Sequence, residues 1–134
     1  MILVAGFGCR RGCAADELLA LLRACLAEAR LDEGVLQALA SSEAKALEGG
    51  LRDLARQLQL PLELLDAARL APYEHRLTST SALARQATGS PGVAEAAALA
   101  LAESLAEGPA RLLVTKRRSA NATCALAMAP ALMG

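Results

Sequence analysis

Short β-prone apolar runs alternate with longer apolar stripes of helical period along this chain. Residues 2–5 form the first such run and predict a buried strand, and a glycine-rich turn follows at 6–12. A helix is predicted from about residue 14 to Arg30, with acidic Asp16 and Glu17 in its first turn and Arg30 near its end, as the helix dipole favours. One apolar face of this helix is formed by Leu18, Leu22, Cys25, Leu26 and Ala29.

The same alternation continues to the last residues. Strands are predicted at 35–40 and 62–65, with a short helical turn around Lys45 and a helix at 51–59 between them. A further helical turn is expected at 66–70, a short helix at 83–87, and a well-buried helix at 91–106 that begins at Ser90-Pro91. Strands at 112–115 and 123–128 would form an antiparallel hairpin through a turn at 119–121. We therefore expect one domain over residues 1–134, a three-layer α/β/α fold with a mostly parallel sheet of about five strands and a C-terminal hairpin.

The least regular segment lies at 71–81. It contains Tyr73, His75 and a run of hydroxyl side chains that includes Ser79 and Ser81. Long polar loops in compact domains often carry function, so this segment is interpreted as a functional loop or lid. Ser79 and Ser81 would donate hydrogen bonds to a substrate carboxylate; the alternative is a solvated loop.

Composition narrows the classes of ligand. Hydrophobic residues make up 54% of the chain, but it has one Phe, one Tyr and no Trp. Single-stranded nucleic acid binding relies on stacked aromatic side chains, and binding of any polyanion relies on a basic field, whereas the net charge here is zero. Nucleic acid is therefore excluded as a partner, and anion recognition has to be local.

Histidine and cysteine usage predicts neither a metal site nor a cofactor. His75 is the only histidine, and the spacing of Cys9 and Cys13 is that of neither a zinc knuckle nor a CxxC redox pair. The apolar run at the N-terminus is too short for a signal peptide, and no apolar stretch reaches the length of a membrane span. We expect a cytoplasmic protein with reduced thiols and no membrane partner.

The glycine-rich turn is the main candidate for chemistry. Glycines between a strand and a helix let the backbone approach a ligand, and the helix that follows presents free N–H groups to an anion. The candidate contacts are Gly8, Cys9, Arg10, Arg11 and Gly12. Two alternatives remain: the glycines serve close packing while the arginines are solvated, or the turn belongs to a nucleotide-binding regulatory domain. Against the second, the last glycine comes one residue too late for a dinucleotide fingerprint.

Four blocks, in order, make the chain resemble the CobE/CbiG C-terminal-domain family of cobalamin biosynthesis. They are 6–12, 40–51, 89–99 and the pair 113–116 with 122–127. The sequence departs from the family at Cys13, where a hydroxyl residue is common, and it looks like the stand-alone CobE type. The resemblance implies a role in making the corrin ring, through binding of a precorrin or other corrinoid, and contacts with other enzymes of the pathway. CbiG proteins open a lactone on a cobalt-precorrin and release acetaldehyde, so a hydrolase acting on the precorrin periphery is the alternative function.

Corrin precursors carry many carboxylates, which need several local cations and backbone donors. In an α/β sheet the loops at the carboxyl ends of parallel strands converge, so Lys45 and Lys116 would join the arginines of the glycine-rich turn. Glu95 lies on an otherwise Ala/Leu helix, where a carboxylate needs a partner or a cleft. If the protein is an enzyme, Glu95 and Cys9 are the candidate catalytic residues, in acid–base and nucleophilic roles.

Overall fold

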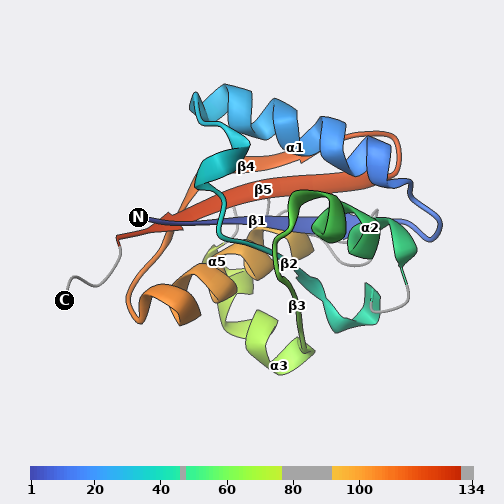
Figure 1. Cartoon of the computed structure of the whole chain (residues 1–134). Coiled ribbons are helices and arrows are strands. Elements are labelled where there is room, and N and C mark those ends of the chain that lie inside the picture. Colours follow the sequence, from blue (N-terminus) through green and yellow to red (C-terminus); the bar gives the residue numbers. More distant parts are fainter. Residues whose placement is uncertain (46–47, 77–91, 131–134) are drawn as a thin grey trace.

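A single sheet, drawn in Figure 1, organises the molecule. A computed structural model of the chain describes residues 1–45, 48–76 and 92–130. The strand order is β3-β2-β1-β5-β4, in which β1, β2 and β3 pair in parallel and β5 runs antiparallel to both neighbours. The strands are β1 (Ile2–Cys9), β2 (Ala38–Ser42), β3 (Leu62–Leu65), β4 (Arg111–Arg118) and β5 (Ala122–Ala129). The predicted α/β fold, with its largely parallel sheet and C-terminal hairpin, is confirmed.

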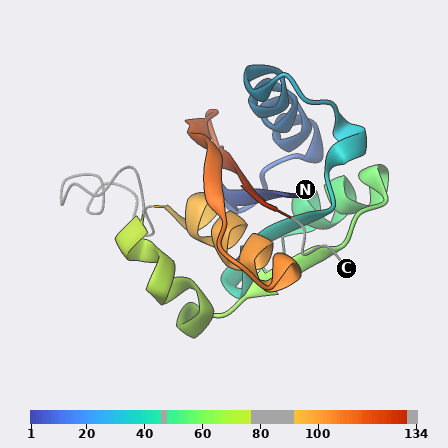
Figure 2. The same ribbon diagram turned by 90° about the vertical axis from the view of Figure 1, so that its left-hand side faces the viewer.

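Helices cover both faces of the sheet, as the end view in Figure 2 shows. One face carries α1 (Ala15–Ala29) and α2 (Gly49–Leu58), and the other carries α5 (Val93–Ala106) and α3 (Ala67–Leu70). Short 3-10 helices connect them: η1 (Glu33–Val35), η2 (Glu43–Lys45) and η3 (Ala71–Arg76). Each layer has its own apolar core, one around Phe7 and Leu22 and one around Val4 and Leu99.

The pleat of β1 distributes its residues between the two cores. Phe7 and Cys9 point toward α1, whereas Gly6 lies against α5. A Cβ atom on Gly6 would stand 2.0 Å from the carbonyl oxygen of Ala94, so the helix backbone rests directly on the strand. The prediction of a turn over 6–12 is therefore wrong in its first half: β1 continues to Cys9 and the turn begins at Arg10. The alternative interpretation, close packing, is confirmed for Gly6.

Three other boundaries differ from the predictions. The second strand begins at Ala38 because Asp32 accepts the N–H of Gly34 at 2.8 Å and holds residues 33–35 in a 3-10 turn. The fourth strand runs on through Arg118, so Lys116 lies within a strand and not in a loop after it. The long helix begins at Val93, one residue after Gly92. The helix predicted at 83–87, with Ser90 and Pro91, lies outside the described residues.

Candidate functional site

The turn after β1 and the β4–β5 hairpin lie together at one end of the sheet. Cys9 is paired with Ala122 across the β1–β5 ladder, and the N–H of Arg10 donates to the carbonyl oxygen of Asn121 at 2.8 Å. Arg118, the last residue of β4, is paired with Thr123. In Figure 1 this end is opposite the one where β1 begins and β5 ends. The predicted convergence of the β1 and β4 ends is therefore present in the backbone.

Three of the predicted contacts are exposed on this turn. The side chains of Arg10 and Arg11 are open to solvent, and Gly12 has a φ of 80°, in the left-handed region that favours glycine. Gly8 and Cys9 lie deeper: Gly8 is half-buried in β1, and Cys9 is 8% exposed within the core beneath α1. The exposed part of the predicted site is thus Arg10 to Gly12, and Cys9 belongs to the core beneath α1.

The start of α2 contacts the same turn. A carboxylate oxygen of Glu48 accepts the N–H of Gly12 at 2.9 Å. A Cβ atom on Gly50 would stand 2.1 Å from the carbonyl oxygen of Cys13, so the first turn of α2 packs against the backbone that leads into α1. Lys45 ends η2, just after the parallel strand β2, and its side chain lies outside the described residues. Neither role of Glu48 or Gly50 could be predicted, because both contacts depend on how two distant segments pack.

Cys13 is a poor nucleophile in this position. Burial, and after it the negative charge of the neighbouring Glu17 carboxylate, raise the pKa of its thiol to about 11. The thiol is therefore protonated at neutral pH. None of the four cysteines, all within the described residues, forms a disulfide.

Glu17 fastens α1 to the hairpin turn. One of its carboxylate oxygens accepts the backbone N–H of Asn121 at 2.7 Å and the hydroxyl of Ser119; the other accepts the Asn121 side-chain amide at 3.0 Å. These bonds, that from Ser119 first, lower the pKa of the Glu17 carboxyl below its ordinary value. The sequence indicated only a favourable helix-dipole position for Glu17, since nothing in it places the hairpin turn beside the helix.

Glu95 joins α5 to the edge strand. Its side chain is fully buried, and one carboxylate oxygen accepts the backbone N–H of Lys116 at 2.9 Å. The register of β4 against β5 shifts between Val114 and Arg117, so the ladder is irregular where Glu95 makes this bond. Glu95 thus has a buried structural contact at the end of the sheet that carries the turn, and the Lys116 side chain beside it is half-buried.

Arg117, Phe7 and Tyr73 all make contacts within the protein. Arg117 forms an exposed ion pair with Glu28 at 2.5 Å. Phe7 is fully buried in the core, and Tyr73 donates its hydroxyl to Glu103 at 2.9 Å. Ser79 and Ser81, and the second half of the predicted 71–81 loop, lie outside the described residues.

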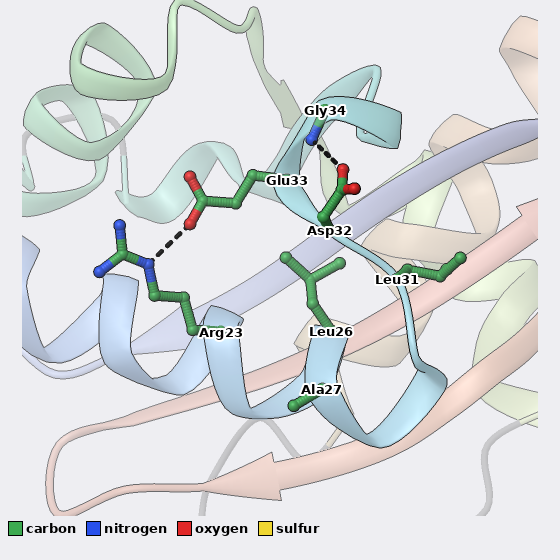
Figure 3. A pocket seen from close by; sticks show the side chains of 7 residues that line it. All are labelled: Arg23, Leu26, Ala27, Leu31, Asp32, Glu33 and Gly34. Atoms are coloured by element: carbon green, nitrogen blue, oxygen red, sulfur yellow. Dashed lines mark hydrogen bonds and ion pairs between the residues drawn. The ribbon is translucent and has the colours of Figure 1, made fainter.

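A shallow pocket of about 430 Å³ lies elsewhere, between the second half of α1 and η1. Figure 3 shows Arg23 and Glu33 linked across it by an ion pair of 2.6 Å, with Leu26 and Leu31 on its apolar side. Its lining comprises Arg23, Leu26, Ala27, Leu31, Asp32, Glu33 and Gly34. None of the residues predicted for the anion site lines this pocket.

Within residues 1–45, 48–76 and 92–130, no cluster of three or more His, Cys, Asp or Glu side chains could hold a metal ion. Among the helices in those ranges, none has both the length and the apolar character that a bilayer crossing requires.

A protein-family model and a known relative both match most of this chain. The family model described as cobalamin synthesis G C-terminus matches residues 3–127. The chain is 40% identical to protein CobE from a Sinorhizobium species over 125 residues, which cover 93% of this chain and 79% of that protein.

Two solved structures are similar over nearly the whole chain. The crystal structure of CobE, a protein from the cobalamin biosynthetic pathway, is 50% identical with a TM-score of 0.88, covering 96% of this chain and 91% of that one. The cobalamin biosynthesis protein chiG from Agrobacterium tumefaciens str. C58 is 37% identical with a TM-score of 0.72, covering 95% and 98%. This chain therefore belongs to the cobalamin-biosynthesis family described as cobalamin synthesis G C-terminus, and CobE is among the proteins to which it is similar.

Proposed function

We propose that this protein binds a carboxylate-rich corrin precursor, a precorrin or related corrinoid, at the end of the sheet where β1 and β4 finish. The observation that carries the proposal is the position of the exposed Arg10–Gly12 turn beside the β4–β5 hairpin, fixed by the bond between the Arg10 N–H and the Asn121 carbonyl. Membership of a cobalamin-biosynthesis family supports the chemical class of the ligand.

The charges at this end suit a ligand with several acidic arms. Arg10 and Arg11 are exposed and offer planar, forked donors that match carboxylates. Arg118, also exposed, ends β4 two strands away in the sheet, or roughly 10 Å at the usual spacing between strands. Cations spread over that distance can contact different carboxylates of one macrocycle, whereas a ligand with a single acidic group would use only one of them.

The sequence-based candidates Lys45, Ser79, Ser81, Lys116 and Glu95 remain part of this proposal. Lys45 follows the parallel strand β2, and Lys116 lies near the end of β4, so both belong to segments at the same end of the sheet. A cytoplasmic location also belongs to the proposal.

The test is a titration of the purified protein with a cobalt-free corrinoid carboxylic acid, followed by visible absorbance. The wild type should bind, and Arg10→Ala with Arg11→Ala should weaken binding about fivefold or more, because each removes charge-assisted hydrogen bonds at an exposed site. Arg111→Ala is the matched control. Arg111 is also exposed, but it is paired with Met128 near the other end of the sheet, so its removal should leave binding unchanged.

Mass spectrometry of the recovered ligand separates two roles. An unchanged mass would make the protein a binder or carrier, and a changed mass would indicate the hydrolase alternative and direct attention to Glu95 and Cys9. Absence of corrinoid binding, or equal binding by the arginine variants and the wild type, would overturn the proposed site. Thermal stabilisation by nucleotides but not by corrinoids would instead favour the nucleotide-binding alternative.

A further inference from the structure

The backbone N–H of Gly12 already donates a hydrogen bond to a carboxylate of the protein. Glu48 accepts this N–H at 2.9 Å, next to the exposed arginines of the same turn. A backbone N–H on a turn that also carries two exposed arginines is where an acidic arm of the ligand is expected to bind. The protein's own side chain thus stands where a ligand group would bind.

The side chain of Glu48 does not cap its own helix. It is the N-cap residue of α2, with extended backbone angles, and its side chain makes no capping hydrogen bond. An N-cap side chain that accepts a bond from its own helix usually stabilises that helix. Here the carboxylate instead bonds another segment of the chain, which the close approach of Gly50 to the Cys13 carbonyl oxygen holds within reach.

We infer that Glu48 is a resident competitor, whose carboxylate must leave the Gly12 N–H before a carboxylate of the ligand can take its place. This inference rests on the proposed function and adds a rule of specificity to it. Because Glu48 is tethered beside the turn, its effective concentration there is high. A simple carboxylic acid displaces it poorly, whereas a ligand whose other carboxylates already contact Arg10 and Arg11 displaces it readily.

Two substitutions separate competition from a structural role. Glu48→Gln keeps an oxygen acceptor but removes the charge, and Glu48→Ala removes the competitor entirely. Competition predicts that both bind the cobalt-free corrinoid acid more tightly than the wild type, by about fivefold or more for Glu48→Ala, the usual net worth of one hydrogen bond. A purely structural role predicts the reverse: weaker binding by Glu48→Ala, restored by Glu48→Gln. Glu43→Gln, the same charge change on exposed η2, controls for long-range electrostatics and should change binding less than about twofold.

The Gly12 amide proton gives a direct signal in NMR spectra. In the wild type it should have the downfield shift of a proton bound to a carboxylate, with or without ligand. In Glu48→Ala it should lie upfield when the protein is free and move downfield at saturation. An amide that stays upfield in ligand-saturated Glu48→Ala, or tighter binding confined to Glu43→Gln, would overturn the inference.

A second probe keeps the two proposals distinguishable. If no form of the protein binds the corrinoid, the proposed function fails, and succinate then decides the role of Glu48. The Gly12 amide of Glu48→Ala should respond to succinate at concentrations about fivefold or more below those needed for the wild type. Equal responses, or none from either protein, would show that Glu48 does not compete with anions at this turn.

Discussion

Glu17 shows how much one carboxylate can contribute when its partners come from a different part of the chain. Its two oxygens accept bonds from Ser119 and Asn121, which belong to the turn between β4 and β5. The same turn accepts the Arg10 N–H, so the charge on Glu17 stabilises the hairpin that flanks the proposed binding surface.

Glu17→Gln should lower the free energy of unfolding at pH 7, and the deficit should disappear in acid. The hydrogen bonds lower the folded-state pKa below the ordinary value of 4.5, so the stabilisation is fully present above that value and is lost as pH falls through the folded pKa. Urea unfolding of wild type and variant at pH 7 and pH 3 measures the difference. Asp16→Asn, an exposed neighbour in the same helical turn, is the control, and a Glu17→Gln deficit that is equal at both pH values would contradict the account.

At the scale of elements, the distance between α5 and the sheet depends on Gly6, which has no side chain to separate them. Gly6 leaves space for the backbone of α5, and the Ala-rich face of that helix continues the close contact along β1 and β5. This explains why a chain with almost no aromatic residues can still fill two cores: small residues bring backbones together where larger ones would hold them apart.

Gly6→Ala should destabilise the protein by about 3 kcal/mol, because the new methyl group meets the backbone oxygen of Ala94 and the helix has to move. Gly49→Ala is the matched control, since a Cβ atom there meets nothing within 4 Å. It lies in the first turn of α2 and should be neutral or stabilising by up to about 1 kcal/mol. Chemical denaturation of the two variants checks both values, and similar stabilities would show that α5 adapts without cost.

At the scale of the whole molecule, the four thiols sample different depths of one core. Cys25 and Cys124 are fully buried, with the Cys25 thiol donating to the Cys124 carbonyl oxygen at 3.6 Å, whereas Cys13 lies under the exposed turn. The rate at which each thiol reacts with a labelling reagent therefore reports how far the structure must open to expose that thiol.

Thiol labelling of the native protein should follow that order. At pH 9, chosen because the Cys13 pKa of about 11 leaves little thiolate at neutral pH, Cys13 should react through local opening of the turn, well before Cys124. The Cys124 rate should rise with urea in step with global unfolding. Residue-resolved mass spectrometry provides the measurement, and equal rates for the two thiols would refute the distinction.

Within the described residues, sequence periodicity was sufficient for the order and type of the strands and α-helices, because β1, α1, β3 and the hairpin each carry an uninterrupted local pattern. It did not predict the 3-10 helices η1 and η3, the second of which lies in the first half of the segment interpreted as a loop. It misplaced the turn after β1, since Gly6 is selected by the position of α5, some 90 residues away along the chain. For the same reason the sequence placed Arg10 and Arg11 at an exposed turn but missed Glu17 and Glu48. Their partners, Asn121 and Gly12, are brought to them only by the packing of the folded chain.

The strand order has a consequence for synthesis in the cell. β5 is made after the other four strands, yet it lies between β1 and β4 and supplies both with a partner. Until the ribosome has released residues 122–129, β4 has no neighbour and one edge of β1 is open to other chains. Before that point no strand lies between β1 and β4, so the final fold, and with it the surface around Arg10, forms only once translation of β5 is complete.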